Sequence, residues 1–82
     1  SELGVKNIRV NGISAGPIPT VSARGVSGFS EFTAAYEEKT PLRRNVTQDE
    51  VAKTALYLLS DLSSATTGEI LFVDSGYHIL GV

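Results

Sequence analysis

The segment that most constrains the fold spans residues 8–20 and reads I-R-V-N-G-I-S-A-G-P-I-P-T. Its β-branched residues, bounded by Asn7 and by Gly16-Pro17, predict a buried strand over residues 7–14. In open α/β sheets, loops that leave the carboxyl ends of strands bind ligands. The backbone groups after Pro17 and the hydroxyl of Thr20 can hold an amide or a phosphate. The alternative is a plain turn that only ends the strand, and spacing alone favours that simpler role.

Two helices are expected after a long loop over residues 15–28. Phe29, Phe32 and Tyr36 are spaced by three and four, which predicts a helix over residues 30–39. These rings are expected in the core, although their place after the loop also allows an apolar wall for a ligand. The sequence T-Q-D-E at residues 47–50 is a capping box, which begins a second helix that runs to about residue 60. The apolar stripe expected on this second helix consists of Val51, Ala55, Leu58, Leu59 and Leu62.

An unbroken apolar run, I-L-F-V at residues 70–73, predicts a second strand covered on both faces. Helices between two strands indicate a parallel pair. Two parallel strands cannot cover both of their faces with this little chain, and residues 1–4 look like the last turn of a helix closed by Gly4. We therefore expect residues 1–82 to be a C-terminal fragment of one larger α/β domain.

Composition excludes several classes of function. The net charge of −2, with scattered basic residues, gives no reason to expect nucleic acid, and no apolar run approaches the ~20 residues that span a bilayer. With no cysteine and one histidine, no metal site is expected. His78 is expected to be a packing or surface residue, and Arg43-Arg44 a solvated or carboxylate-paired turn. No G-x-G-x-x-G is present, and no Ser-His-Asp triad is expected.

Four motifs together carry a resemblance: S-A-G-P-I-x-T after I-R-V-N, T-P-L-R-R, D-E-V-A, and T-G-E-I-L-F-V-D-S-G-Y-H. The chain resembles the C-terminal part of the short-chain dehydrogenase/reductase superfamily, and more narrowly the enoyl-acyl-carrier-protein reductases. This resemblance implies an α/β fold that is the C-terminal part of a Rossmann-like doubly wound parallel sheet. That part would have two strands, about two main helices and a substrate-binding loop near residues 20–29.

The resemblance also implies an activity. Such enzymes of fatty acid synthesis reduce the trans-2 double bond of an enoyl thioester on acyl carrier protein with NADH or NADPH; NADH is expected here and NADPH is possible. Their catalytic Tyr and Lys would lie in an N-terminal remainder of the reductase, so no catalytic residue is expected in this chain. A homotetramer in the cytoplasm, or in a plastid-type organelle, is implied as well.

The residues implied to bind lie in two groups. Gly16, Pro17, Ile18 and Thr20 would border the nicotinamide, with the Ile18 backbone on its carboxamide. The acyl chain would be faced by Ser22, Ala23, Val26 and Phe29.

Two other functions remain open from the sequence. The chain could belong to another short-chain reductase, such as a 3-oxoacyl-acyl-carrier-protein reductase. It could also be a non-catalytic interaction module, which would need a core of its own.

Overall fold

The computed structural model describes residues 1–18 and 28–80 of the chain. Strands β1 (Gly12–Ala15) and β2 (Ile70–Val73) form a parallel pair in which Gly12 lies opposite Ile70 and Ala15 opposite Val73. This confirms the predicted parallel pairing. The other elements are η1 (Gly4–Lys6), α2 (Phe29–Lys39), α3 (Gln48–Leu59), η2 (Asp61–Ser63) and η3 (Tyr77–Leu80).

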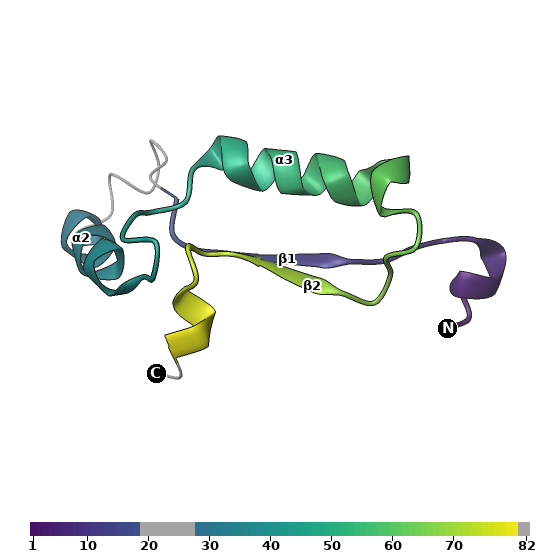
Figure 1. Cartoon of the computed structure of the whole chain (residues 1–82), viewed down its shortest axis with the longest axis horizontal. Helices are drawn as coiled ribbons and strands as arrows, with labels where there is room; N and C mark the ends of the chain where they lie inside the picture. Colours follow the sequence, from purple (N-terminus) through teal and green to yellow (C-terminus); the bar gives the residue numbers. More distant parts are fainter. Residues whose placement is uncertain (19–27, 81–82) are drawn as a thin grey trace.

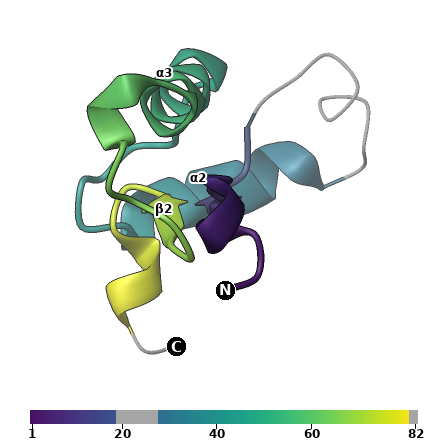
Figure 2. The ribbon, with the colours of Figure 1, turned by 90° about the vertical axis from the view of Figure 1, so that its right-hand side faces the viewer.

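The elements are arranged around the two strands in a simple way. Helix α3 lies along one face of the sheet, and η3 lies on the opposite side (Figures 1 and 2). Helix α2 lies at the end of the sheet where both strands terminate (Figure 1). The carboxyl ends of the strands are therefore bordered by α2 and η3, whereas the amino ends face the chain start.

Strand β1 is shorter than the sequence predicted and begins at Gly12 rather than at residue 7. The partner strand sets this limit, because the chain before Ile70 is a turn with Gly68 at φ 70°. In that region Val10 donates its N–H to the Thr67 hydroxyl, at 3.1 Å, and accepts from the Gly68 N–H, at 2.9 Å. The residues before Gly12 are thus fixed by irregular hydrogen bonds instead of a strand ladder.

Helix α3 begins at the predicted capping box. The Thr47 hydroxyl accepts from the Glu50 N–H at 3.1 Å, and the Glu50 carboxylate accepts from the Thr47 N–H at 2.9 Å. Arg44 adds a two-point ion pair to the same carboxylate, at 2.9 and 2.7 Å. The Arg44 hydrogen bond, followed by the Thr47 N–H, lowers the pKa of Glu50 to about 2. The Glu50 carboxylate therefore stays ionised far below neutral pH, and the start of α3 stays capped.

The predicted apolar stripe of α3 is only partly correct. Leu58 is buried and Val51 and Ala55 are half-buried against the sheet, but Leu59 and Leu62 are 85% and 81% exposed. The sheet beneath α3 is only two strands wide, so one narrow row of side chains finds cover. On α2, Tyr36 is buried as expected, whereas Phe32 is 57% exposed.

The hydrophobic core is small. Among the residues that the structure describes, three hydrophobic side chains are buried: Tyr36, Val46 and Leu58. Ile70 and Phe72 of β2 are 58% and 49% exposed, so the expectation that β2 is covered on both faces is wrong for this chain. One face of the sheet carries α3, and much of the other face is open.

At the amino end, the left-handed cap differs from the expected one. The short helix η1 ends at Asn7, which has φ 61° and donates its N–H to the Gly4 carbonyl at 2.9 Å. Gly4 is instead the first residue of η1. Asparagine tolerates this conformation better than most residues do, so it can serve as the cap in place of glycine.

Arg9 joins the amino end of the sheet to the end of α3. Its guanidinium donates to the carbonyl oxygens of Leu58, Ser60, Ser63 and Thr66 at 2.8–3.3 Å, and to the Ser63 hydroxyl at 3.0 Å. A helix leaves its last carbonyl groups without intrahelical partners, and a cation there is favoured by the helix dipole. Arg9 thus caps α3 from a segment far away in the sequence.

We predict that the isolated 82-residue chain melts without a sharp cooperative transition. The three hydrophobic side chains buried within residues 1–18 and 28–80 supply too little apolar burial to offset the conformational entropy of ordering these residues. Calorimetry and far-UV circular dichroism of the isolated chain would measure this. A sharp two-state melt would contradict it and favour a self-sufficient interaction module.

Replacing Arg9 by Met should destabilise the longer protein expected to carry this chain. The change removes the hydrogen bonds of a charged donor to four carbonyl groups, each of which keeps at least one other partner, at a cost of about 3 kcal/mol, and lowers the thermal midpoint. Lys53→Met is the control, because the Lys53–Asp49 pair is exposed and worth little. Equal midpoints for the two variants would show that the Arg9 contacts are dispensable.

Candidate functional site

The carboxyl edge of the sheet brings together two turns. The first, here called the β1 turn, consists of Gly16, Pro17 and Ile18, all half-buried. The Gly16 N–H donates to the Val73 carbonyl at 3.0 Å, which adds a last bond after the β1–β2 ladder. The second, the β2 turn, consists of Asp74, Ser75 and Gly76.

The β2 turn is organised by the Asp74 carboxylate. It accepts from the N–H groups of Gly76 and His78, each at 3.0 Å, and contacts His78 Nδ1 at 3.1 Å. Burial acts to raise the pKa of Asp74, but the hydrogen bonds from His78 and Gly76 outweigh it and lower that pKa. The carboxylate is therefore ionised at neutral pH and fixes the turn between β2 and η3.

The segment after α2 packs onto the β2 turn. The Leu42 N–H donates to the Ser75 carbonyl at 3.1 Å, and a Cβ on Gly76 would lie 2.9 Å from Pro41. Gly76 also has φ 90°, a conformation that glycine adopts without strain. The T-P-L and V-D-S-G motifs of the sequence are thus two sides of one packing contact.

Tyr36 on α2 connects the two turns. Its hydroxyl donates to the Asp74 carbonyl at 2.9 Å, and its ring stacks on Tyr77 with centroids 4.7 Å apart. Burial, then the charge of Asp74 and the neighbouring Tyr77, raises the pKa of the Tyr36 phenol, so this group is a hydrogen-bond donor at neutral pH. The sequence indicated Tyr36 as a core residue, with an apolar ligand wall as the alternative.

His78 and the two arginines have the structural roles expected of them. The His78 ring stacks on Phe72 with centroids 4.0 Å apart and contacts Asp74, so His78 is a packing residue at the surface. Arg44 is paired with the Glu50 carboxylate, which agrees with the expectation of a carboxylate-paired turn. The Arg43 guanidinium donates to the Glu38 and Thr40 carbonyl groups.

Of the residues implied to bind ligand, four lie in the part of the chain that the structure describes. The β1 turn, with Gly16, Pro17 and Ile18, lies at the carboxyl edge, and Phe29 is half-buried at the start of α2. Thr20, Ser22, Ala23 and Val26 lie outside the described residues. A hollow of about 230 Å³ at this edge is lined by other residues, among them Leu42, Phe72 and the whole β2 turn.

Two residues of this edge could not be assigned from the sequence. Asp74 follows an apolar strand, as many functional carboxylates do, but its bonds to Gly76 and His78 are local and hold the turn. Tyr36 reaches the edge only through the tertiary packing of α2. For Asp74 the sequence held a hint, its position at a strand end. For Tyr36 it indicated a place in the core or in a ligand wall, but not the contact with Asp74.

The described residues offer neither a metal-binding cluster nor a membrane-spanning helix. Within residues 1–18 and 28–80, no group of three or more His, Asp or Glu side chains is arranged to hold a metal ion. None of the helices in these two ranges has the length and apolar character needed to cross a membrane.

Comparison with solved structures confirms the predicted fold class. The crystal structure of the Bacillus cereus enoyl-acyl carrier protein reductase with NADP+ and indole naphthyridinone matches with a TM-score of 0.88 at 57% identity, over 99% of this chain and 32% of that one. The reductase from Anaplasma phagocytophilum in complex with NAD matches with a TM-score of 0.87 at 51% identity, over 99% of this chain and 31% of that one.

Sequence comparison agrees. The FabI enoyl-acyl-carrier-protein reductase of Staphylococcus aureus (strain MRSA252), named as an NADPH enzyme, is 62% identical over 96% of this chain. The Bacillus cereus FabI, named as an NADH enzyme, is 57% identical over 99% of it. The chain spans about a third of the length of these relatives. A family model described as "Enoyl-(Acyl carrier protein) reductase" matches residues 1–78, and the chain therefore belongs to that family.

Proposed function

We propose that this chain is the C-terminal part, in a single Rossmann-like domain, of a reductase that reduces the trans-2 double bond of enoyl thioesters on acyl carrier protein. The observation that carries the proposal is the family match over residues 1–78 together with the β1 turn at the carboxyl edge of the sheet. Relatives with this name are NADH or NADPH enzymes, so either cofactor is possible here. The reaction would serve fatty acid synthesis.

The β1 turn fits the nicotinamide end of such a cofactor by its chemistry. The peptide groups around Ile18 offer an N–H and a carbonyl, which complement the oxygen and the amide nitrogen of a carboxamide. Pro17 fixes its own φ and so stiffens the turn, and Thr20 would add a hydroxyl for the carboxamide or the pyrophosphate. When bound, NAD(P)H supplies the hydride for the double bond. The part of this chain would be to orient the nicotinamide ring, which sets the geometry of transfer.

The substrate side of the site would be formed by the segment that leads into α2. Ser22, Ala23, Val26 and Phe29 are the residues proposed to face the acyl chain. Phe29 supports this role because it is half-buried at the first turn of α2, on the same edge as the β1 turn. An apolar wall at this place would exclude water from the reacting carbon atoms.

This chain is not proposed to catalyse alone. The catalytic Tyr and Lys implied by the family would come from the N-terminal remainder of the reductase. We therefore propose that the remainder is an obligatory partner, and that it covers the open face marked by Ile70 and Phe72.

We also propose that the complete reductase is a homotetramer in the cytoplasm. Ile79 and Leu80 of η3 are 68% and 36% exposed, and Leu59 on α3 is exposed as well. Apolar surface is therefore available for contacts between subunits. Light scattering of the complete protein at micromolar concentration tests the assembly. A monomer mass would contradict it.

The activity is tested by following the oxidation of NADH and of NADPH by the complete protein with an enoyl thioester. A 3-oxoacyl thioester of the same chain length is the matched control. Oxidation with the enoyl substrate alone is expected. Oxidation with the 3-oxoacyl substrate alone would instead assign the chain to a 3-oxoacyl reductase.

Replacing Phe29 by Ala should raise the KM for long enoyl thioesters by roughly tenfold and leave the KM for NADH or NADPH nearly unchanged, because the variant removes one apolar wall. Steady-state kinetics with a short and a long thioester measures this. Phe32→Ala is the control. Phe32 lies about one turn further along α2, and its side chain is 57% exposed, so its loss should leave both KM values nearly unchanged. Equal effects on cofactor and thioester would contradict the role of Phe29.

A further inference from the structure

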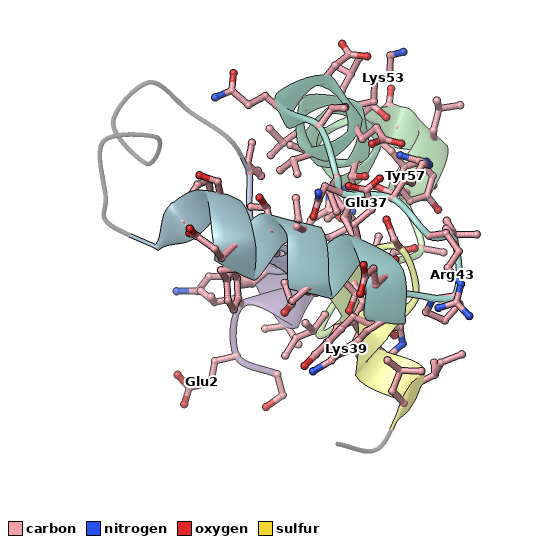
Figure 3. The ribbon with its side chains drawn as sticks, turned by 90° about the vertical axis from the view of Figure 1, so that its left-hand side faces the viewer. Glu2, Glu37, Lys39, Arg43, Lys53 and Tyr57 are labelled. Atoms are coloured by element: carbon pink, nitrogen blue, oxygen red, sulfur yellow. The ribbon has the colours of Figure 1, made fainter. Side chains whose placement is uncertain are left out.

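Tyr36 fastens the body of helix α2 to the carboxyl edge of the sheet. This residue is 7% exposed, donates its hydroxyl to the Asp74 carbonyl at 2.9 Å and stacks on Tyr77. Figure 3, which looks at the molecule from the α2 end, shows α2 lying in front of the strand ends with α3 above it. The hydroxyl of Tyr36 therefore lies between α2 and the strand ends.

The same hydroxyl fills the space beside Gly16. A Cβ on Gly16 would lie 2.5 Å from the Tyr36 hydroxyl oxygen, 3.1 Å from its Cζ and 3.3 Å from a Val46 methyl group. On its other side, the Gly16 N–H is bonded to Val73. Gly16 is thus enclosed between β2 and Tyr36, so the position of Tyr36 fixes how the β1 turn leaves the sheet.

We propose that Tyr36 is a positioning residue for the nicotinamide, acting through the β1 turn. This inference rests on the proposed function, which gives the β1 turn to the cofactor. Tyr36 does not touch the cofactor in this proposal. Tyr36 sets the position of the Gly16 backbone at the end of β1, and thereby the position of the Ile18 peptide groups two residues later. Since α2 follows the segment proposed to face the acyl chain, Tyr36 also ties the cofactor side of the site to the substrate side.

The test is a double-mutant cycle in the complete protein, with Gly16→Ala, Tyr36→Phe and their combination. In Gly16→Ala the new Cβ meets the hydroxyl, and the turn must move by about 1 Å, so kcat/KM for the cofactor should fall roughly a hundredfold. Tyr36→Phe keeps the stacked ring but loses the bond to Asp74. Its KM for the cofactor should rise roughly tenfold while the KM for the thioester stays within about twofold.

The decisive protein is the double variant. Without the hydroxyl, the nearest ring atom lies 3.1 Å from the new Cβ, a contact that a small shift relieves. The combination should therefore recover most of the cofactor kcat/KM lost in Gly16→Ala, to within roughly tenfold of the parent. Losses that simply multiply would overturn the proposal, as would a harmless Gly16→Ala. Tyr57→Phe is the matched control, because it removes the hydroxyl of a 41% exposed tyrosine on α3 that is not among the nearest neighbours of a Cβ at Gly16 (Figure 3).

A second measurement keeps the result clear if a variant does not fold. Cofactor binding is followed by the fluorescence of NADPH, and folding by the thermal midpoint. A double variant that folds where Gly16→Ala does not would support the proposal. If both fail to fold, Tyr36→Phe decides, and an unchanged cofactor KM overturns the role of Tyr36.

The outcomes separate this inference from the function on which it rests. A parent protein that uses only a 3-oxoacyl thioester overturns the proposed substrate, while the cycle on cofactor binding still decides the role of Tyr36. A parent that binds no reduced nicotinamide overturns both. A working enoyl reductase with a multiplicative cycle overturns the role of Tyr36 alone.

Discussion

The Arg9 guanidinium donates to carbonyl oxygens of Leu58, Ser60, Ser63 and Thr66, which belong to the end of α3 and the turn after it. Among the described helices, α3 is the one that lies along the sheet (Figure 1). Because Arg9 holds the C-terminal end of α3, it helps to set the direction of α3 along the sheet. The other end of α3 is held by Thr47, Glu50 and Arg44, close to the β2 turn. The two ends of α3 are therefore held at opposite edges of the sheet, by Arg9 at one end and by the capping box at the other.

The motifs that carry the family resemblance mostly describe packing. Pro41 contacts Gly76, Leu42 bonds to Ser75, and the capping box begins α3, none of which requires a substrate. They describe the scaffold, whereas the residues proposed to bind the ligands lie in the β1 turn and the segment after it. A scaffold of this kind does not by itself determine which substrate is used.

The parts of the fold that were predictable depend on neighbouring residues in the sequence. The capping box and the apolar run fixed the start of α3 and the bounds of β2, because both act within a few residues. The start of β1, the exposure of Leu59 and Phe32 and the cap at Asn7 depend on which other elements lie nearby. A periodic pattern states that a face is apolar, but it does not state what covers that face.

The same distinction applies to the candidate site. Gly and Pro in succession after an apolar run indicate the end of a strand, so the β1 turn was predictable. The family resemblance then suggested which ligand this turn would bind. The contact of Tyr36 with Gly16 was not predictable, because the two residues lie in different elements that only tertiary packing brings together. Thr20, Ser22, Ala23 and Val26 lie outside the described residues and stay predictions.

The register in which Gly12 lies opposite Ile70 bears on how the chain folds. These partners are far apart along the chain, and the entropy of closing so long a loop must be overcome before their ladder can form. The backbone hydrogen bonds within helix α3 are local and its N-terminal capping box is complete, so it can form early and offer its C-terminal end to Arg9. We therefore expect the strands to join late in folding, and the edge that carries the β1 turn to acquire its final shape only after the scaffold around it has condensed.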